Sequence, residues 1–482
     1  MITTQILNSE EIQRIHTCSL KILSKVGVRF LSPKAREILK ARGAIVKDKI
    51  VFIPEELVNE ALRTAPKTFI LGARDRQKDF TMPKTGLAGT VVDNSGVFTL
   101  DFHTGERREC NLQDLFNFNK VYEASRWSTV VWPATIQEPD RPEHSREFRQ
   151  DIYSFMSTSL HVQSELWHPA EVPLMAEALN LITGSEAETI NRKIYSFTYC
   201  TNPPLGHDKE MCETYLESLP LGIPICVYPM PGAGSTGPAS LFSNIAVANA
   251  EALSALVLFQ MAKPGTPIIF GNAIGTTNFR NGNFLEGVPE TVLQTAACGE
   301  LAHFYGLPNE QAGCLTDAKT HGAQAILEKT ITTIPLLNSG VDLLQGPGAL
   351  ECSNTITLEQ IVVDDEIINY AQRLRRGIDT SIEKNYFTDI EEVGPGGHYL
   401  MQPSTVMACR SDEFMTQELT DGDTYETWTA KGKHDMYSKA RIRVEEILAG
   451  AERYPLADNI KGGLEDIMRK ADILLSPEKL NH

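Results

Sequence analysis

The sequence predicts an α/β protein built on a (β/α)8 TIM barrel, with N-terminal α+β and C-terminal helical additions. Strand-like and helix-like segments alternate from about Leu112 onward. Apolar runs within them, such as IPICVYP and TPIIFG, suit strands that are buried on both faces of a parallel sheet. A doubly wound open sheet is the competing architecture. No GxGxxG motif follows the first strand, which disfavours the dinucleotide-binding form of that sheet.

Residues 1–111 are predicted to form an N-terminal α+β cap region. Asn8 or Ser9 can cap a first helix. For a second helix, Ser32 suits the N-cap, Pro33 the first position and Gly43 the exit. Short strands separated by turn residues complete the region.

Residues 112–390 are predicted to form the barrel. Seven strands are expected, each followed by a helical segment, and closure needs an eighth strand whose signal is weaker. The expected strands are Val130–Ile136, His161–Trp167, Lys193–Cys200, Ile223–Pro229, Thr266–Asn272, Glu310–Thr316 and Val341–Gln345. Residues 391–482 are predicted to be mainly helical and to pack on the barrel. Thr357 and Gln360 form a possible capping box just before that region.

The charge composition indicates which classes of partner the chain can bind. The 482-residue chain has 45 basic and 62 acidic side chains, a formal net charge of -17. This balance argues against a nucleic-acid partner, because phosphate binding needs a basic surface. It favours a cationic small substrate, although high solubility alone also explains an acidic surface.

Cysteine usage and the terminus indicate a cytoplasmic protein. None of the nine cysteines forms a CxxC pair, which is typical of a reducing compartment. The N-terminus lacks a basic region followed by an apolar run, so no signal peptide is predicted. The apolar stretch around Leu253–Ala262 is too short to span a membrane.

Polar and aromatic residues at the predicted strand ends are the candidate site residues, because barrel enzymes carry their chemistry on that face. Trp167, Tyr199 and Tyr228 could contact a ligand, although aromatic residues in such places often serve packing. Asn272 and Gln345 each follow an apolar run and precede small residues. We expect these two side chains to face the barrel cavity.

The run DAKTH offers acid–base side chains in Asp317, Lys319 and His321. It supports an alternative function, a barrel lyase or isomerase. Asp317 could equally be the N-cap of the following helix, with the other two side chains solvated.

Three glycine-rich stretches directly follow predicted strands: PMPGAGSTGPAS, GNAIGTTNFRNGN and QGPGALE. Glycine lets the backbone approach a large flat ligand, although tight turns after strands also favour it. HExxH, the P-loop, the GxSxG elbow and a spaced Cys/His ligand set are all missing from the sequence. A reaction whose chemistry is supplied by a cofactor fits this pattern.

Several long segments resemble the trimethylamine:corrinoid methyltransferase superfamily. They are GAGSTGPASLFSNIAVANAEALSALVLFQMAKPGTPIIFGN, LTDAKTHGAQAILEKT, SGVDLLQGPGALECSNTITLEQIVVDDEI and GPGGHYL. Together they span most of the chain. After GPGGH, whose histidine is His398, many members continue with a His-Thr pair, whereas this chain reads Pro403-Ser404-Thr405.

The resemblance implies a TIM barrel whose mouth accepts a methylamine and the corrinoid (cobalamin) of a partner protein. The founding trimethylamine enzyme uses pyrrolysine, whose counterpart here would lie near Thr316 and Asp317. Since the sequence shows only standard residues, it is similar to the non-pyrrolysine branch, whose known members demethylate quaternary amines such as glycine betaine. The expected partners are a corrinoid protein, a small quaternary amine and further copies of the chain, without nucleic acid, membrane, tightly bound metal or nucleotide.

Under this resemblance, a cation would be held by aromatic faces and a nearby carboxylate, and a substrate carboxylate by cationic or amide groups. The expected catalytic residues are Asp317, Gln345 and His398. The expected substrate-binding residues are Trp167, Tyr199, Tyr228, Asn272, Phe279, Arg280 and Glu351. The expected corrinoid-facing residues are Gly232, Gly234, Ser235, Thr236, Gly271, Gly346 and Gly348. A non-catalytic quaternary-amine-binding subunit is the remaining alternative function.

Overall fold

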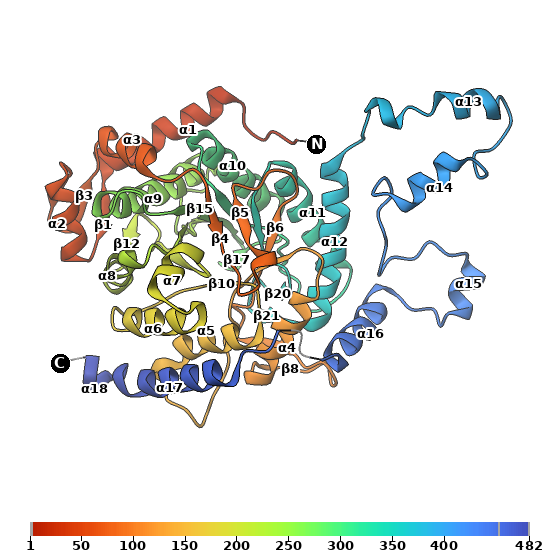
Figure 1. Ribbon diagram of the computed structural model, residues 1–482. Coiled ribbons are helices and arrows are strands. Elements are labelled where there is room, and N and C mark those ends of the chain that lie inside the picture. Colours follow the sequence, from red (N-terminus) through yellow and green to blue (C-terminus); the bar gives the residue numbers. More distant parts are fainter. Residues whose placement is uncertain (1–2, 452–453, 481–482) are drawn as a thin grey trace.

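A closed barrel of eight parallel strands forms the centre of the computed structural model, which describes residues 3–451 and 454–480 (Figure 1). The predicted fold class is confirmed. The strands, in chain order, are β6 (Gly89–Val92), β9 (Ser128–Val131), β10 (His161–Ser164), β11 (Tyr195–Cys200), β13 (Ile225–Tyr228), β15 (Ile268–Asn272), β18 (Asn309–Ala312) and β19 (Leu343–Gln345).

The eighth strand is β6, which closes the barrel between β19 and β9. The sequence assigned this segment to the cap region, so the predicted start of the barrel at residue 112 is too late. Its signal is weak because the strand begins with Gly89, which lacks a side chain. A Cβ atom on Gly89 would lie 2.5 Å from Oγ1 of Thr129 and 2.8 Å from the Phe80 ring, so the barrel leaves no room for a larger residue.

A layer of helices surrounds the barrel (Figure 1). These helices are α4 (Leu112–Glu123), α5 (Arg146–Ser157), α6 (Glu171–Thr183), α7 (Glu186–Arg192), α8 (Lys209–Ser218), α9 (Leu241–Ala262), α10 (Pro289–Tyr305), α11 (Ala323–Asn338) and α12 (Leu358–Arg376). Among the described residues, α9 is the one helix long and apolar enough to cross a membrane, and 94% of its most apolar window is buried within this fold. Its apolar length is explained by packing between the barrel and the N-terminal layer.

The N-terminal layer covers α9. It consists of α1 (Ser9–Lys21), β1 (Val28–Phe30), α2 (Pro33–Ala41), β2 (Ile45–Lys47), β3 (Ile50–Phe52) and α3 (Glu55–Thr64). Its caps were predicted: Oγ of Ser32 accepts from the Ala35 amide at 3.1 Å, and Asn8 forms a capping box with Glu11. The layer joins the barrel through β12 (Gly206–His207), which pairs with β1.

Short strands lie at the two ends of the barrel. The hairpin of β4 (Phe69–Leu71) and β5 (Phe80–Met82) packs into the same interior cluster as the barrel strands. Two small sheets follow the C-terminal ends of the barrel strands. The first contains β14 (Gly232–Ala233), β16 (Gly275–Thr277) and β17 (Phe284–Leu285), and the second contains β20 (Ala349–Leu350), β21 (Thr355–Ile356), β7 (Phe98–Leu100) and β8 (Arg107–Glu109).

The C-terminal region divides into packed helices and a projecting arm. Helix α16 (Met436–Ala449) packs on α12 and α4, and α17 (Asp458–Leu474), followed by α18 (Pro477–Leu480), packs on α5 and α6. Helices α13 (Phe387–Val393), α14 (Pro403–Arg410) and α15 (Tyr425–Ala430) extend away from the barrel (Figure 1). Residues 412–421, between α14 and α15, return to α12, where Leu419 is buried and Arg373 donates to the Glu413 carbonyl. The sequence predicted that all of residues 391–482 pack on the barrel. For residues 378–410 this is wrong, because all of them except Ser404 are partly or fully exposed.

A buried ion pair fixes the loops that follow β18 and β19. Lys329 of α11 and Asp364 of α12 lie 2.8 Å apart, and both side chains are fully buried. The Lys329 ammonium also donates to the carbonyl of Cys314 at 2.7 Å, and the Asp364 carboxylate accepts from the amide of Gly348 at 2.7 Å. Helices α11 and α12 thereby hold the backbone at the barrel mouth.

We predict that Asp364→Ala lowers the free energy of unfolding by about 3–5 kcal/mol, because it leaves the Lys329 ammonium buried without its counter-ion. Urea unfolding followed by circular dichroism measures the change. The control is Glu446→Ala, which breaks the exposed Arg443–Glu446 pair and should cost less than about 1 kcal/mol. Equal losses in the two variants would contradict the role given to the buried pair.

Candidate active site

The barrel mouth carries a layer of inward-facing side chains at the C-terminal ends of the strands. Side chains alternate along a strand, so the residues two positions beyond the central apolar layer face inward again. That central layer contains Val91, Val130, Cys226, Ile269 and Leu343. The inward-facing residues at the mouth are Asp93, Trp132, Glu165, Cys200, Tyr228, Gly271, Ala312 and Gln345.

Two predicted site residues meet in this layer. The hydroxyl of Tyr228, at the end of β13, donates to the side-chain oxygen of Gln345, at the end of β19. Gly271 makes room for the Tyr228 ring, because a Cβ atom there would lie 2.6 Å from Cδ2 of the ring. Burial holds the pKa of Tyr228 well above its ordinary value, so the hydroxyl stays protonated. The pair places an aromatic ring and an amide group at the inner wall of the mouth.

Carboxyl groups lie inside the barrel beside this pair. Oε2 of Glu310 accepts from Nε2 of Gln163 at 3.1 Å, and Oε1 of Glu310 has no hydrogen-bond partner among the described residues. Glu165 accepts from the Cys200 thiol at 2.9 Å. Burial raises the pKa of Glu310 and of Glu165 to about 7. Both carboxyl groups therefore change charge near neutral pH. The ionised form can attract a cationic ligand, and the protonated form can donate a hydrogen bond.

A second carboxyl cluster joins the loops above the mouth. The amides of Glu286 and Gly287 donate to the two carboxylate oxygens of Asp317 at 3.0 and 3.1 Å, and Oγ of Ser353 donates to Glu286 at 2.9 Å. Burial, together with the charges of Asp93 and Asp317, raises the pKa of Glu286 to about 7. Asp317, a predicted catalytic residue, thus joins its own loop to the loop of Glu286, and Glu286 joins that loop to Ser353. It is not a helix N-cap, since α11 begins at Ala323.

Large apolar side chains are exposed around the mouth. Trp167 follows β10, Met230 follows β13, Phe242 lies in the first turn of α9, and Phe279 lies in the loop after β16. Phe279 is 74% exposed. Because these residues follow barrel strands, they form an apolar rim on the same face as the inward-facing carboxyl groups.

Two predicted cavity residues face the helical layer instead. The Tyr199 hydroxyl is 2.8 Å from Nδ1 of His207, and its ring packs against Tyr215 and Phe259. The prediction placed Tyr199 on the inward face of β11, but the inward-facing residue is its neighbour Cys200, one position further along the strand. Asn272 donates to Gln311, whose Cγ lies against α10, so this amide joins two strands outside the cavity.

Other predicted residues lie away from the interior. His398 is exposed on the projecting arm, between α13 and α14. Glu351 pairs with Arg107 at 2.9 Å, and Arg280 is exposed beside Phe279 in the rim loop. Within the DAKTH run, the Lys319 ammonium donates to the Asp317 carbonyl at 2.6 Å. His321 stacks on Tyr437 and bonds Thr357 at 2.7 Å, and burial lowers its pKa to about 4. These side chains do not converge on one reacting atom.

The chain's own side chains and backbone fill the space beside the predicted corrinoid-facing glycines. A Cβ atom on Gly234 would lie 2.4 Å from the Phe279 ring, and one on Gly346 would meet the carbonyl oxygen of Gly313. The remaining residues of this set serve local structure in the same way: Gly232 packs on Phe284, Thr236 accepts from the Gly232 amide, Ser235 accepts from Thr277, Gly271 packs on Tyr228 and Gly348 packs on Ile361.

The residues that sequence reasoning missed are mostly acidic: Asp93, Glu165, Glu286 and Glu310. The period of two along HVQSE places the polar side chains of Gln163 and Glu165 on one face of a buried strand, and this signal was available. Glu286 gave no signal, because its position depends on contacts between loops. Among the described residues, no three His, Cys, Asp or Glu side chains are grouped so as to hold a metal ion.

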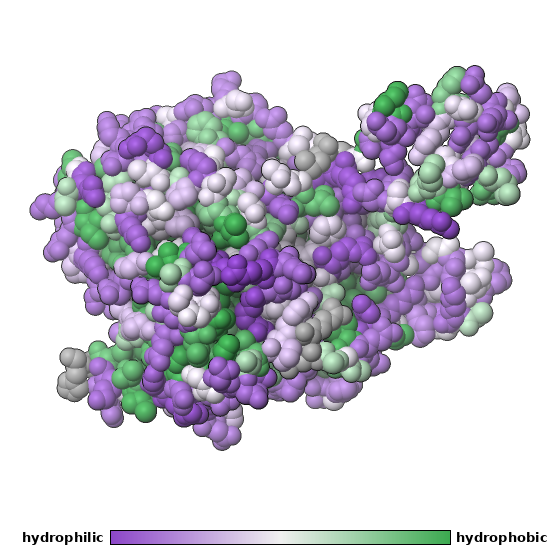
Figure 2. Space-filling model, viewed as in Figure 1, coloured by the Kyte–Doolittle hydropathy of each residue, from purple (hydrophilic) through white to green (hydrophobic). Residues whose placement is uncertain are grey.

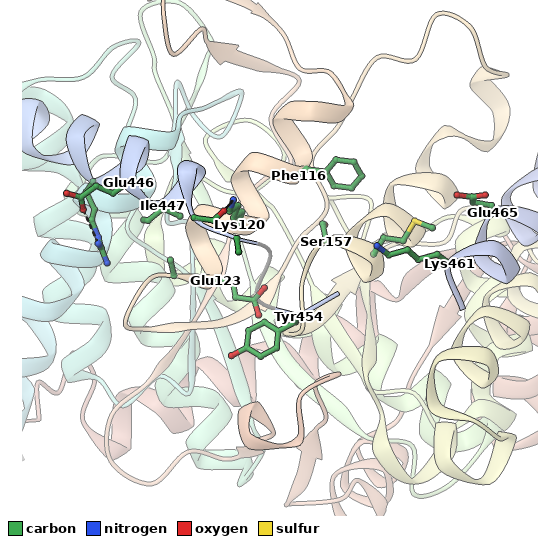
Figure 3. A pocket seen from close by; sticks show the side chains of 14 residues that line it. Phe116, Lys120, Glu123, Ser157, Glu446, Ile447, Tyr454, Lys461 and Glu465 are labelled. Atoms are coloured by element: carbon green, nitrogen blue, oxygen red, sulfur yellow. Dashed lines mark hydrogen bonds and ion pairs between the residues drawn. The ribbon is translucent and has the colours of Figure 1, made fainter. Parts of the chain in front are cut away.

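A cavity of about 740 Å³ lies elsewhere, between α4, α5, α16 and α17 (Figure 3). Lys120, Glu123, Phe116, Tyr454 and Lys461 are among the residues that line it. It opens at the ends of α4 and α5 that precede β9 and β10, which is the face opposite to the mouth. Barrel enzymes do not use this face for chemistry.

The chain is similar to several known methyltransferases. The model of the family described as trimethylamine methyltransferase (MTTB) matches residues 1–473. A trimethylamine methyltransferase of Methanosarcina barkeri is 28% identical over 98% of this chain and 96% of its own length. A glycine betaine methyltransferase of Desulfitobacterium hafniense is 30% identical over 92% of both chains. The crystal structure of the M. barkeri monomethylamine methyltransferase aligns with 96% of this chain over 92% of its own residues, with 11% identity and a TM-score of 0.49.

The raised pKa of Glu310 predicts a pH effect on stability. The folded state favours the protonated carboxyl, so its stabilising contribution is complete below the unfolded pKa near 4.5 and is lost as the pH rises through about 7. Glu310→Gln, which cannot ionise, should therefore lose less stability between pH 4.5 and pH 8 than the wild type, by up to about 3 kcal/mol. Urea unfolding at both pH values measures this, with the exposed Glu446→Gln as control. Identical pH profiles for wild type and Glu310→Gln would contradict the assignment.

Proposed function

The chain belongs to the trimethylamine methyltransferase (MTTB) family, and we propose that it transfers a methyl group from a quaternary amine to the Co(I) corrinoid of a partner protein. Glycine betaine or a related betaine is the proposed donor, in line with the betaine-specific relative. The observation that carries the proposal is a barrel interior lined by Tyr228, Glu165 and Glu310 beneath an exposed apolar rim.

The inward-facing residues fit a cationic head group. The rings of Tyr228 and Trp132 can each contribute about 0.5–2 kcal/mol through cation–π contact. Ionised Glu310 or Glu165 adds Coulomb attraction in a site with little water. Lys and Arg are absent from the inward-facing residues described above, so the interior does not repel a cation.

A betaine also carries a carboxylate, which needs a hydrogen-bond donor. The Gln345 amide supplies one inside the barrel, and a protonated Glu310 or Glu165 supplies another, because a carboxyl group with a pKa near 7 is a donor for part of the time. Arg280 offers a charged donor at the rim.

The reaction needs no nucleophile from the protein. A Co(I) corrinoid bound at the mouth would supply the electron pair for the new bond to the methyl carbon, and the C–N bonding pair would leave with the neutral tertiary amine. A quaternary nitrogen is already positively charged, so no residue has to protonate the leaving group. Tyr228, Gln345 and the carboxyl groups therefore act by positioning the ammonium group and excluding water.

The partner protein must reach the mouth. Trp167, Met230, Phe242 and Phe279 form an apolar rim there, and exposed apolar surface of this kind marks protein contact sites. The amides of Gly234 and Gly346 donate to the carbonyls of Gly237 and Val91, so these glycines shape the turns beside the rim and leave the contact with the partner to the exposed side chains.

Spectroscopy tests the proposed reaction. The purified chain is mixed anaerobically with a Co(I) corrinoid, free or on its cognate protein, and a panel of methylamines and betaines is added one at a time. Conversion of Co(I) to methyl-Co(III) with one quaternary amine, and none with trimethylamine, is the expected result. Tight binding without conversion would support a non-catalytic binding subunit, and turnover of a compound without any corrinoid would support acid–base chemistry instead.

Replacing Tyr228 by Leu removes the ring that faces the cation. We expect a rise in KM of about 2- to 30-fold, which corresponds to the 0.5–2 kcal/mol of a cation–π contact. Tyr228→Phe keeps the ring and should change KM less. Tyr199→Phe, on the outward face of the wall, is the matched control. If Tyr228→Leu and Tyr199→Phe behaved alike in steady-state methyl transfer, Tyr228 would not be a substrate contact.

A further inference from the structure

The projecting arm exposes an unusual amount of apolar side chain. Of residues 377–435, all of which the structure describes, only Ser404 and Leu419 are buried. Figure 2 shows hydrophobic side chains interspersed with hydrophilic ones on this lobe. The large apolar residues exposed there are Ile378, Ile382, Phe387, Ile390, Tyr399, Leu400, Met401, Val406, Met407, Phe414 and Tyr425. Eleven exposed large apolar side chains within one 59-residue segment indicate a surface that contacts another molecule.

The arm is also strongly acidic. Residues 377–435 contain 12 acidic and 4 basic side chains, a net charge of -8 out of the -17 of the whole chain. Helix α13 places Glu391 and Glu392 next to Phe387 and Ile390, and no ion pair involves either glutamate within the described part of the chain. A partner for this surface should therefore be basic and partly apolar.

The N-terminal layer has this chemistry. Residues 1–64, which include the whole layer, contain 11 basic and 7 acidic side chains, a net charge of +4. Lys47 and Lys49 flank the turn between β2 and β3 and are exposed. Ile45 on the same strand is 61% exposed and Val26 is 60% exposed. Basic and apolar groups thus share one surface.

The arm cannot reach this surface within one molecule. Figure 1 shows α2 and β3 at one end of the chain's long dimension and α13 at the other, with the barrel between them. Both halves of a complementary contact are therefore present on each chain but are held apart. In a pair of copies related by a two-fold axis, the arm of each copy contacts the N-terminal layer of the other. Such a dimer is closed, because neither arm is left free.

We propose that the acidic, apolar arm of one copy docks on the basic N-terminal layer of a second copy, so that the chain forms a closed dimer. Apolar side chains such as Leu400 and Met401 supply the buried area, and Glu391 and Glu392 meet Lys47 and Lys49. The proposal does not depend on the methyl-transfer reaction, because neither surface includes a residue of the barrel mouth.

Charge-swap variants of the full-length chain test the proposal, with mass measured by light scattering after gel filtration at low and high salt. The wild type should be a dimer whose dissociation constant rises with salt. E391K/E392K and K47E/K49E should each raise that constant at least tenfold, and the combination of all four changes should restore the dimer. L400D/M401D should give monomers at any salt concentration. E445K/E446K on α16, which makes the same charge change elsewhere, is the control and should remain dimeric.

Several results would overturn the proposal. They are a monomeric wild type at every concentration, an oligomer that both charge-reversed pairs leave intact, or a combined variant that stays monomeric while its circular dichroism is unchanged. If the arm variants stayed dimeric but no longer bound a corrinoid protein, the arm would instead be a docking site for that protein.

Discussion

Closure of eight parallel strands is the constraint on which the site depends. Once β6 joins β19 to β9, every second side chain must enter an interior with no access to water from the sides. Apolar side chains fill the middle of that interior, and polar ones collect where the strands end. The buried contact between Lys329 and Asp364 then holds the loops after β18 and β19 over this opening. The mouth therefore results from packing rules that apply throughout the barrel.

The acidic interior is costly for folding, which argues for a functional reason to keep it. Burial raises the pKa of Glu165, Glu286 and Glu310 to about 7, so each carboxyl group is destabilised in its charged form. A bound cation would offset the cost of burying the charged carboxylate. A bound carboxylate would accept a hydrogen bond from a protonated carboxyl group. The same groups can thus receive both ends of a zwitterion, without an Arg or Lys inside the barrel.

The sequence predicted most of the fold and only part of the site. Strands β13 and β15 were predicted from continuous apolar runs, whereas β6 was missed because it begins with Gly89 and lies among the short strands assigned to the N-terminal cap region. Tyr228 and Gln345 were found because they end apolar runs. Tyr199 was chosen in place of Cys200, since a run that is buried on both faces does not show which residue faces inward. Glu286 and the position of His398 depend on contacts between loops and on the path of the arm, which local patterns do not contain.

A crystal structure with a bound trimethylammonium compound that cannot be demethylated would locate the substrate. The ammonium group should lie inside the mouth of the barrel, in contact with the ring of Tyr228 and within Coulomb range of the Glu310 carboxylate. Binding at the cavity between α4 and α17, or at the rim with the interior unchanged, would contradict the assignment of the barrel interior as the methyl-donor site.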